Sequence, residues 1–351
     1  MEQKKNLTIK DIAKLANVSP GTVDRVIHNR GKVSDKALAK VSVVLEEIQY
    51  KPNVFAQSLK KQKSLYFSVL IPRKEDDGYW RTAHEGITRA IEDFDHFGID
   101  VKVTSFNSKL PADFTSKANE ILSESPNGLL ITPVFLQESL DILKKFENAG
   151  IPYVTFNTKI PDLNPSCAIG QNLKQSGRLA ANLIDHCCKQ MGNLLIIHLD
   201  ENPGNAPHMI QKENGFREYF QSRNHNMEIK SIVIPHREPA LINDILNKQA
   251  GDLRNVTGAF VTTAKVHLVA YPIKSRFNDC VVIGYDPTAN NIDGIKSGTI
   301  DFLINQNPYM AAYEGIAKLT DLLVFGKNID PEKLLPLDII TSENLDSYLL
   351  N

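Results

Sequence analysis

Apolar residues recur at every third or fourth position in three short segments within the first 50 residues. This spacing predicts three amphipathic helices, each with one face turned toward a small core. The predicted apolar faces are Ile9, Ile12, Ala13 and Ala16, then Val23, Val26 and Ile27, and then Leu38, Val41, Leu45 and Ile48. Residues 17–19 alone separate the first two segments, which is the tight spacing of a helix-turn-helix.

Capping residues stand at the predicted start of each helix. Thr8 and Asp11 form a T-x-x-D capping box at the first helix. Ser19 is a favoured N-cap for the second helix, and Pro20 suits its first position because an N–H there would be unpaired. Ser34 is the expected N-cap of the third helix.

Beyond residue 65 the pattern changes, because short apolar runs alternate with longer amphipathic stretches. The runs predict strands at 66–72, 101–106, 128–133, 153–156, 194–200, 229–235, 259–263 and 281–286, with a further extended run at 300–305. The stretches predict helices at 82–96, 115–123, 136–149, 176–191, 212–222, 239–250 and 308–325. This alternation predicts an α/β body with parallel sheets covered by helices, in two lobes.

Charge is distributed unevenly along the 351 residues. The net charge is −1, but residues 1–63 carry 13 Lys/Arg and 6 Asp/Glu, a net of +7, and the remainder carries −8. This asymmetry is typical of a nucleic-acid-binding head joined to an acidic body. A positive head would also make DNA affinity strongly dependent on salt.

The second predicted helix turns polar residues outward, as a DNA-reading helix does. Its N-terminus favours phosphate, and Arg25 can donate two hydrogen bonds to guanine. Thr22, Lys32 and Ser34 can hold phosphates and fix the register on the duplex. The alternative is a three-helix protein-interaction module with solvated charges.

The start of the chain resembles the DNA-binding domain of the lactose-repressor (LacI) family. The segments that carry the resemblance are T-I-K-D-I-A-K-L-A-x-V-S-x-x-T-V-x-R-V, then V-S, and then Y-K-P-N. The match runs from Thr8 to about Lys61. The resemblance implies that the second helix enters the major groove and that the segment after Pro52 is a hinge helix that folds on operator DNA. Leu59 matches the family's leucine wedge in the minor groove. Without the resemblance, residues 53–63 would be taken as a basic linker.

Two residues of the head depart from the family pattern. Asp24 stands where a small residue is usual, and His28 replaces the common Asn. Both departures bear on the operator sequence more than on DNA binding itself. The predicted DNA-binding residues are Thr8, Ser19, Pro20, Gly21, Thr22, Asp24, Arg25, His28, Lys32, Ser34, Asn53, Ala56 and Leu59.

Polar and aromatic residues follow the predicted strands of the body. Open α/β sheets bind ligands beyond the carboxyl ends of their strands. Aromatic rings stack on the apolar face of a sugar, and carboxylate and amide groups bond its hydroxyls. The candidates at these ends are Asp77, Tyr79, Trp80, Asn157, Thr263, Asp286 and Gln306.

The body resembles the ribose-binding-protein type of periplasmic sugar receptor across nearly all of residues 65–330. The segments that carry the resemblance are D-G-Y-W-x(5)-G, I-P-Y-V-T-F-N, K-E-N-G-F, V-I-G-Y-D-P-T and I-N-Q-N-P. It implies that Tyr79 and Trp80 stack on the sugar and adds Lys212, at the position of a sugar-binding Arg. Asp77, Asn157, Thr263, Asp286 and Gln306 then match ligand-binding positions.

Asn157 replaces a ligand Asp, and Lys212 replaces an Arg, so the site loses one negative charge and keeps one positive charge. This composition suits a carboxylated or phosphorylated sugar. The alternatives are that Lys212 is a solvated helix charge and that Trp80 only packs in the core. His84 and Glu85 lack the second His of a metal motif and are interpreted as helix surface.

These features predict a transcriptional regulator with a helix-turn-helix domain at 1–51, a hinge at 52–64 and an effector-binding body at 65–351. The N lobe is expected at about 65–170 and 307–332, and the C lobe at about 171–305 and 333–351. We expect sugar-dependent operator binding by a homodimer, with both induction and corepression open. The alternative function is a sugar-modifying enzyme fused to a DNA-binding head, although no G-x-S-x-G, Walker A or H-E-x-x-H motif is present.

The remaining features predict a cytoplasmic protein. The N-terminal segment lacks an apolar signal core, and no run of about 20 apolar residues could span a membrane. Cys167, Cys187, Cys188 and Cys280 show no zinc or disulfide spacing, so we expect free or buried thiols. We expect no catalytic residues, cofactor or metal, with operator DNA and a sugar as partners.

Overall fold

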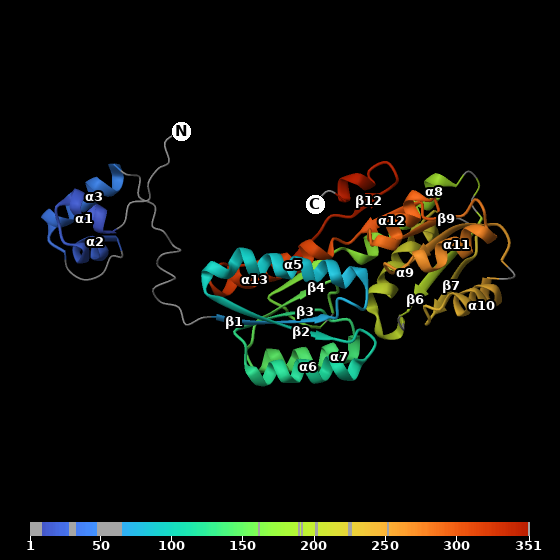
Figure 1. Cartoon of the computed structure of the whole chain (residues 1–351), viewed down its shortest axis with the longest axis horizontal. Helices are drawn as coiled ribbons and strands as arrows, with labels where there is room; N and C mark the ends of the chain where they lie inside the picture. The colour runs from blue at the N-terminus through green and yellow to red at the C-terminus, as the bar shows by residue number, and fades with distance from the viewer. Residues whose placement is uncertain are drawn as a thin grey trace. The chain divides into compact units, whose positions relative to one another are not determined.

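The computed structural model divides the chain into two compact units, residues 1–62 and 63–351. It describes residues 9–27, 33–47, 65–160, 162–188, 190, 192–200, 203–223, 227–250 and 253–349. Figure 1 shows both units, with most of their helices and strands labelled.

The N-terminal unit contains three short helices around a small apolar core. They are α1 (Ile9–Ala16), α2 (Pro20–Ile27) and α3 (Asp35–Glu47). Ser19 Oγ accepts the N–H of Thr22 at 3.2 Å, so it caps α2 as predicted. Leu38 was expected on the apolar stripe of α3 but is 46% exposed, because Val41 and Val44 face the core instead. The buried core residues are Ile12, Ala13, Ala16, Val23, Val41 and Val44.

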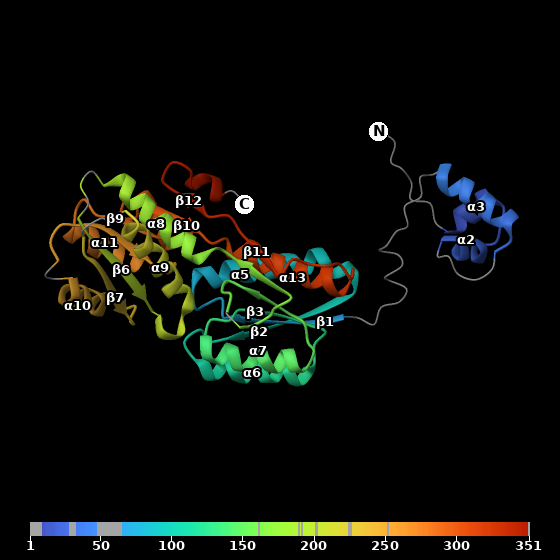
Figure 2. The same cartoon turned by 180° about the vertical axis from the view of Figure 1, so that it is seen from behind.

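The N lobe of the body is built on a six-stranded parallel sheet in the order β11-β5-β4-β3-β1-β2. The strands are β1 (Leu65–Pro72), β2 (Ile99–Phe106), β3 (Gly128–Ile131), β4 (Tyr153–Phe156), β5 (Cys167–Gly170) and β11 (Glu332–Leu334). Helices α5 (Gly78–Phe94) and α13 (Pro308–Leu323) cover one face, and α6 (Pro111–Glu124) and α7 (Leu136–Asn148) cover the other, as Figures 1 and 2 show.

The C lobe repeats this arrangement with the order β12-β10-β9-β8-β6-β7. The strands are β6 (Asn193–Leu199), β7 (Ile229–Ile234), β8 (Val256–Val261), β9 (Val281–Tyr285), β10 (Phe302–Asn305) and β12 (Asp338–Ile340), of which β12 is antiparallel to β10. Helices α8 (Leu173–Cys187) and α9 (Pro207–Gln221) pack on one face. Helices α10 (Pro239–Ala250), α11 (His267–Arg276) and α12 (Ala289–Lys296) pack on the other. Short 3-10 helices lie at Asp95–Phe97, Pro203–Asn205 and Leu345–Tyr348.

Both sheets are buried on both faces. Their central strands are continuously apolar, as in Val69, Leu70 and Ile71 of β1, because helices cover each side. Strands β5, β11 and β12 and helices α11 and α12 were not predicted from the sequence. Strands β11 and β12 have only three residues each, and α11 carries Pro272 within a helix, so their local patterns are weak.

Three crossovers join the lobes, and one side chain connects them. Gln171 lies in the first crossover, after β5. Its Nε2 donates to the carbonyl of Asn305 at 2.7 Å, beside the second crossover, and to the carbonyl of Pro336 at 2.5 Å, in the third. The third crossover follows Leu334, slightly later than the boundary near residue 333 suggested by the sequence. The amide of Gln171 therefore holds the three connecting segments together.

Two glycines set the distance between α8 and α9 in the C lobe. A Cβ on Gly177 would lie 1.8 Å from the carbonyl oxygen of Lys212, and one on Gly215 would lie 1.9 Å from that of Lys174. Backbone atoms on the facing helix cannot move away cheaply, so these positions require glycine. This close crossing fixes the part of α9 that carries Lys212.

We therefore predict that Gly177→Ala destabilises the body. The clash should cost on the order of 2–3 kcal/mol, although alanine favours the helix by about 1 kcal/mol. Urea unfolding of the full-length protein measures the change. Gln175→Ala, at an exposed position of the same helix, is the matched control and should be nearly neutral. Equal midpoints for Gly177→Ala and the unmutated protein would contradict the close-packing argument.

Candidate functional site

The described DNA-contact candidates lie on the outer surface of the head. Ser19, Pro20, Gly21, Arg25 and Ser34 are exposed, and Thr22 and Asp24 are partly exposed. Asn17 has a φ of 49°, so the turn between α1 and α2 uses a left-handed residue that Asn tolerates. Thr8, His28, Lys32, Asn53, Ala56 and Leu59 lie outside the described residues.

The second candidate site lies in a cleft between the lobes, at the carboxyl ends of both sheets. Three polar residues there have left-handed backbone at the ends of strands: Asn157 after β4, Asp200 after β6 and Asp286 after β9, with φ values of 76°, 68° and 59°. Asn and Asp tolerate this conformation better than other residues with side chains. The chain thus leaves each strand sharply, beside a polar side chain.

Residues of both lobes form the wall of a small cavity in this cleft, with a volume of about 50 Å³. Seven of the eight predicted ligand-binding residues lie on the wall; the eighth, Asp286, does not. The wall residues are Asp77, Tyr79, Trp80, Val134, Asn157, His208, Lys212, Thr262, Thr263, Ala264, Lys265 and Gln306.

Two aromatic rings form the N-lobe side of the cavity, from the first turn of α5. Asp77 accepts the N–H of Tyr79 at 3.0 Å and so caps this helix. The rings of Tyr79 and Trp80 meet edge to face at 4.7 Å, and the Tyr79 hydroxyl donates to Asn157 Oδ1 at 3.0 Å. Trp80 also packs in the N-lobe core, so its core and cavity roles are compatible. Burial raises the pKa of Tyr79 well above its usual value.

Lys212 reaches the cavity from α9 and is 1% exposed, which excludes a solvated helix charge. Its Nζ donates to the carbonyl of Thr262 and to Gln306 Oε1, both at 3.0 Å. The same ammonium group lies 3.6 Å from the ring centroid of Tyr285, a cation–π contact. These contacts offset part of the cost of burying a charge.

Asp286 lies behind the wall and bonds to Gln306. Its two oxygens accept the backbone N–H and the side-chain Nε2 of Gln306, at 2.7 and 2.6 Å. Burial raises the pKa of Asp286 to about 6, although these hydrogen bonds oppose the shift. Asp286 thus orients Gln306, whose other amide atom contacts Lys212.

Charged residues of both lobes meet across the cleft beside the cavity. Lys265 Nζ of the C lobe lies 2.8 Å from Asp77 Oδ2 of the N lobe. Burial alone would raise the pKa of Asp77, but the Lys265 ammonium and the Tyr79 N–H lower it below its usual value. This pair is nearly buried and directly bridges the lobes.

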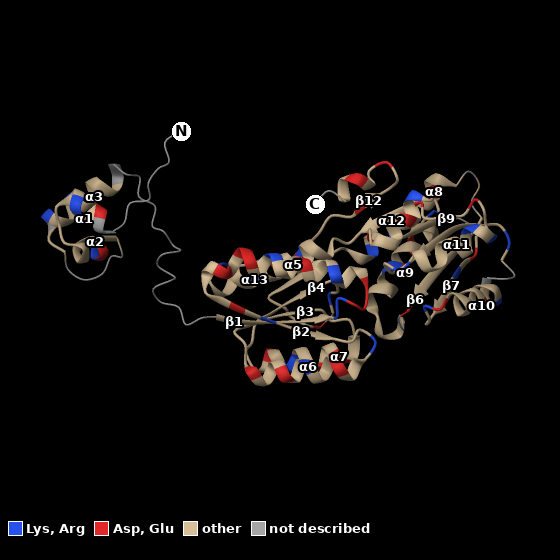
Figure 3. Ribbon diagram, in the orientation of Figure 1, with Lys and Arg blue, Asp and Glu red and all other residues tan. Residues whose placement is uncertain are grey.

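A second group of charges surrounds this pair. Lys109 of the N lobe lies 2.8 Å from Asp200 Oδ1, and Arg237 Nε donates to Asp200 Oδ2 at 2.7 Å. Arg237 Nη1 donates to the carbonyl of Asp76 at 2.9 Å. Figure 3 shows Lys/Arg and Asp/Glu segments close together on the loops where the lobes meet. We name Asp77, Lys109, Asp200, Arg237 and Lys265 the interlobe ion cluster.

A buried polar network supports the cavity wall from inside the C lobe. His198 contacts Thr262 Oγ1 at 3.0 Å through Nδ1 and Glu213 Oε2 at 2.6 Å through Nε2. Glu213 also accepts hydrogen bonds from Arg217 and Ser231, at 2.7 and 2.6 Å. Burial would raise the pKa of Glu213, but these three partners lower it to about 2. The network fixes α9 and β8 at the positions that carry Lys212 and Thr262.

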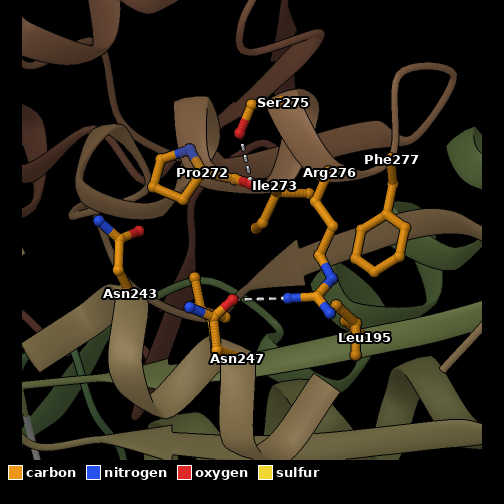
Figure 4. Close-up of a pocket in the computed structure, with 9 residues that line it drawn as sticks. Leu195, Asn243, Asn247, Pro272, Ile273, Ser275, Arg276 and Phe277 are labelled. Carbon is orange, nitrogen blue, oxygen red and sulfur yellow. Dashed lines mark hydrogen bonds between the residues drawn. The ribbon is translucent and has the colours of Figure 1, made fainter. Parts of the chain in front are cut away.

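Two further hollows among the described residues are each lined by one lobe alone. A cavity of about 190 Å³ lies between α10 and α11, where Arg276 donates to Asn247 Oδ1 at 2.7 Å (Figure 4). A hollow of about 600 Å³ lies along α5 and the loop before it, with lining residues from Lys74 to Glu92. The described residues include no group of three or more His, Cys, Asp or Glu that could hold a metal ion. They also include no helix that is long and apolar enough to cross a membrane.

Comparison with known proteins identifies both parts of the chain. Residues 8–53 match the family model for bacterial regulatory proteins of the lacI family, and residues 67–328 match the model for a periplasmic binding protein domain. The chain belongs to the LacI family of bacterial regulatory proteins. It is a DNA-binding transcriptional regulator and not an enzyme, so the enzyme alternative is rejected.

Individual relatives of this LacI-family chain have modest sequence identity. The sucrose operon repressor of Streptococcus mutans is 24% identical over 96% of this chain and 99% of its own length. The ribose operon repressor of Halalkalibacterium halodurans is 28% identical, over 65% of this chain and 62% of its own length. A crystal structure from Bacteroides fragilis, assigned as a LacI transcriptional regulator, has a TM-score of 0.72 and 25% identity over 82% of this chain and all of that chain.

Several residues of the LacI-family cleft were not predicted from the sequence. His208 and Lys265 lie on the cavity wall, and Lys109, Asp200 and Arg237 belong to the interlobe ion cluster. Asp200 ends a predicted strand, so its position was a usable signal. The other four follow no motif, and their partners are distant in sequence.

The Glu213 network predicts a pH-dependent contribution to stability. The folded-state pKa of about 2 lies below the usual 4.5, so the contribution is present above about pH 4.5 and is lost as the pH falls toward 2. Glu213→Gln should lower the free energy of unfolding by on the order of 2 kcal/mol at pH 7. Urea unfolding at pH 7, 5, 4 and 3 measures the difference in unfolding free energy between the variant and the unmutated protein. This difference should become smaller below pH 4.5.

Glu218→Gln is the matched control on the same helix, because Glu218 pairs with Lys174 and Arg178 at the surface. Its effect on unfolding should be small at every pH. If Glu213→Gln lowers the free energy of unfolding as much at pH 3 as at pH 7, the ionised Glu213 does not stabilise the fold in the way assigned to it.

Proposed function

We propose that this LacI-family protein binds operator DNA through α2 and adjusts its operator affinity when a monosaccharide-sized sugar binds between the two lobes. The observation that carries the proposal is the convergence of aromatic, amide and charged side chains from both lobes on one cavity. The sucrose and ribose operon repressors, which are similar to this chain, bear sugar names, and this supports a sugar effector.

The proposed organisation assigns residues 1–51 to the DNA-binding domain, 52–64 to a hinge helix and 65–351 to the effector-binding body. We propose that the protein acts in the cytoplasm as a homodimer. Two heads would then contact the two halves of a roughly palindromic operator.

In the proposed DNA complex, the N-terminus of α2 faces the duplex. The exposed N-terminal residues Ser19, Pro20 and Gly21 allow close approach to phosphate. Arg25 is exposed one turn further along α2, where its guanidinium can donate two hydrogen bonds to guanine. Asp24 is partly exposed beside it and can accept from the amino group of cytosine.

In the proposed sugar complex, Trp80 and Tyr79 contact the apolar face of the ring. Asn157, Thr263 and Gln306 supply neutral polar groups for the hydroxyls. Because the wall combines residues of both lobes, a bound sugar contributes more free energy when the lobes are together than when they are apart. This difference is what allows a ligand to shift a conformational equilibrium.

The proposed coupling runs through the crossovers that Gln171 connects. Gln306 belongs to the second crossover and also lies on the cavity wall. A change at the wall therefore acts directly on a segment that joins the lobes. Linkage requires that operator DNA change the affinity for sugar by the same factor as sugar changes the affinity for DNA.

The experiment that tests the function measures operator binding with and without sugar. Operator sequences are first selected from randomised duplexes by the full-length protein, and the best sequence is labelled for fluorescence polarisation. We expect a salt-dependent dissociation constant that changes when one member of a monosaccharide panel is added. Operator binding that is insensitive to every sugar would contradict the effector part of the proposal.

Arg25→Ala should reduce discrimination at one base pair of the selected operator. The expected loss is ~1–3 kcal/mol, measured by fluorescence polarisation on operators with single base changes. Arg25→Lys is the matched control: it keeps the charge but cannot form the paired hydrogen bonds, so it should retain non-specific affinity and lose discrimination. Unchanged discrimination by Arg25→Ala would show that Arg25 does not contact a base.

Trp80→Ala should abolish the sugar response and leave basal operator binding intact, because the stacking surface is removed while the head is unchanged. Trp80→Phe keeps an aromatic face and should retain part of the response. Fluorescence polarisation gives both quantities, and near-ultraviolet circular dichroism checks that the N-lobe core still packs. A full sugar response in a folded Trp80→Ala protein would contradict the stacking role.

A further inference from the structure

We infer that the interlobe ion cluster is a latch that closes the two lobes without help from an effector. Its contacts are made entirely by groups of the chain itself, so no sugar is needed to form them. The inference deepens the regulation of the proposed function and rests on the coupling proposed there between the lobes and the head. It follows from the position of the cluster, the burial of its carboxylates and the links that separation of the lobes would break.

The cluster includes residues from the sheet edges that lie opposite the crossovers. Strand β2 is the edge strand of the N-lobe sheet farthest from β11 and β5, and Lys109 follows it. Strand β7 is the edge strand of the C-lobe sheet farthest from β12 and β10, and Arg237 follows it. Contacts far from a hinge move most when the lobes rotate about that hinge. A small rotation about the crossovers therefore separates these charges before it disturbs Gln171.

Asp200 is the centre of the latch. Its side chain is 3% exposed, and cationic groups of both lobes surround it. Lys109 Nζ of the N lobe lies 2.8 Å away, Lys265 Nζ of the C lobe lies 3.8 Å away, and Arg237 of the C lobe donates to the same carboxylate. Burial alone would raise the pKa of Asp200, but Arg237 and Lys109 lower it below its usual value. The carboxylate is therefore ionised near neutral pH, and its attraction to Lys109 is stronger than that of a surface pair.

Two more links of the cluster cross between the lobes. Asp77 Oδ2 and Lys265 Nζ are 2.8 Å apart, and both side chains are only 10% exposed. Arg237 Nη1 donates to the carbonyl of Asp76 at 2.9 Å. Separation of the lobes would replace both links, and the contact of Lys109 with Asp200, by contacts with water. Because the Asp77–Lys265 pair is nearly buried, salt screens it less than it screens a surface pair. Together these links favour the closed arrangement of the lobes.

A latch that acts without sugar makes part of the regulatory change before any effector binds. The effector-free protein is then a mixture of open and closed bodies, and its basal operator affinity lies between the values for the two states. A sugar completes the shift, and its apparent affinity is higher because a larger fraction of the protein is already closed. A weaker latch should therefore move the basal operator affinity away from the closed-state value.

The lobes also touch at a point that suits a cross-link. A Cβ atom on Gly78 of the N lobe would lie 3.2 Å from Thr288 Cβ of the C lobe. Disulfides join residues whose Cβ atoms are about 3.5–4.5 Å apart, so cysteines at these two positions can pair after a small adjustment when the lobes are together. Such a disulfide reports closure while it forms and locks the closed state once formed.

Cross-linking of the full-length Gly78→Cys/Thr288→Cys protein tests the latch without any sugar. The equilibrium constant for the 78–288 disulfide is measured in a glutathione redox buffer, and peptide mass spectrometry distinguishes this bond from bonds of the native cysteines. We expect the disulfide to form without sugar. Asp200→Asn should lower its equilibrium constant about threefold or more, because three cationic groups then lose their shared carboxylate. Asn also tolerates the left-handed backbone at this position, where φ is 68°.

Lys109→Met breaks one link and should lower the same constant by a smaller factor, about twofold. Because Lys109 is exposed, this variant keeps the test valid if Asp200→Asn fails to fold. Lys102→Met is the matched control. The Lys102 side chain is 52% exposed and that of Lys109 is 53% exposed, but Lys102 pairs with Glu124 inside the N lobe. Lys102→Met removes the same charge without affecting the latch, so it should leave the constant unchanged.

Operator binding connects the latch with regulation. Fluorescence polarisation on the selected operator compares the oxidised and reduced forms of the Gly78→Cys/Thr288→Cys protein, and the difference gives the effect of closure. Asp200→Asn and Lys109→Met, each in the chain without the two cysteines, should shift the operator dissociation constant in the opposite direction from the disulfide. Lys102→Met should not shift it.

A disulfide equilibrium that neither Asp200→Asn nor Lys109→Met changes would overturn the latch and leave the proposed regulator intact. An equally large decrease in Lys102→Met would also overturn it, because the effect would then follow from net charge alone. If the latch variants weaken cross-linking but the disulfide leaves operator binding unchanged, the latch is supported, and the coupling of the lobes to the head in the proposed function is wrong.

Discussion

The cleft depends on one constraint, the burial of a charged ammonium group between α9 and the end of β8. Lys212 must find polar partners where water cannot supply them, and it finds the Thr262 carbonyl, the amide of Gln306 and the face of Tyr285. Each partner is fixed in turn: Asp286 holds Gln306, and the His198–Glu213 pair holds Thr262 and α9. Gln306 also belongs to a crossover, so one polar network contains both the ligand-facing charge and a segment that joins the lobes.

The parallel sheets explain why so many polar groups face the same cavity. All strands of the N lobe, and all but β12 of the C lobe, run in one direction within their sheet, so each strand delivers its next residue to the same edge. Asn157, Asp200 and Asp286 adopt left-handed backbone at these ends, which turns the chain out of the sheet immediately. The local backbone and the polar chemistry therefore have the same cause: Asn and Asp serve both needs.

The sequence predicted the architecture well wherever the local pattern was long and strong. The runs 66–72 and 194–200 correspond to β1 and β6, whereas β11 is a three-residue edge strand whose register with β5 depends on tertiary pairing. The same limit applies to the cleft. Motif-bearing residues such as Tyr79 and Gln306 could be selected from sequence, but Lys265 and Asp77 are 188 positions apart, and no local pattern indicates that they meet. Long-range ion pairs are created by the fold and are absent from any window of sequence.

The interlobe ion cluster favours contact between the two lobes even when no ligand is bound. Lys109 and Asp77 of the N lobe face Asp200, Arg237 and Lys265 of the C lobe, and the partial burial of Asp200 makes these pairs less sensitive to screening than surface pairs. Asp77 and Lys265 both lie on the cavity wall, so an effector in the cavity enters this balance of charges. Its effect on DNA binding is therefore set by the difference between the interlobe contacts that it replaces and those that it creates, and not by the total strength of its binding. Two ligands of equal affinity can then differ in regulatory effect, according to whether they leave the Asp77–Lys265 pair in place.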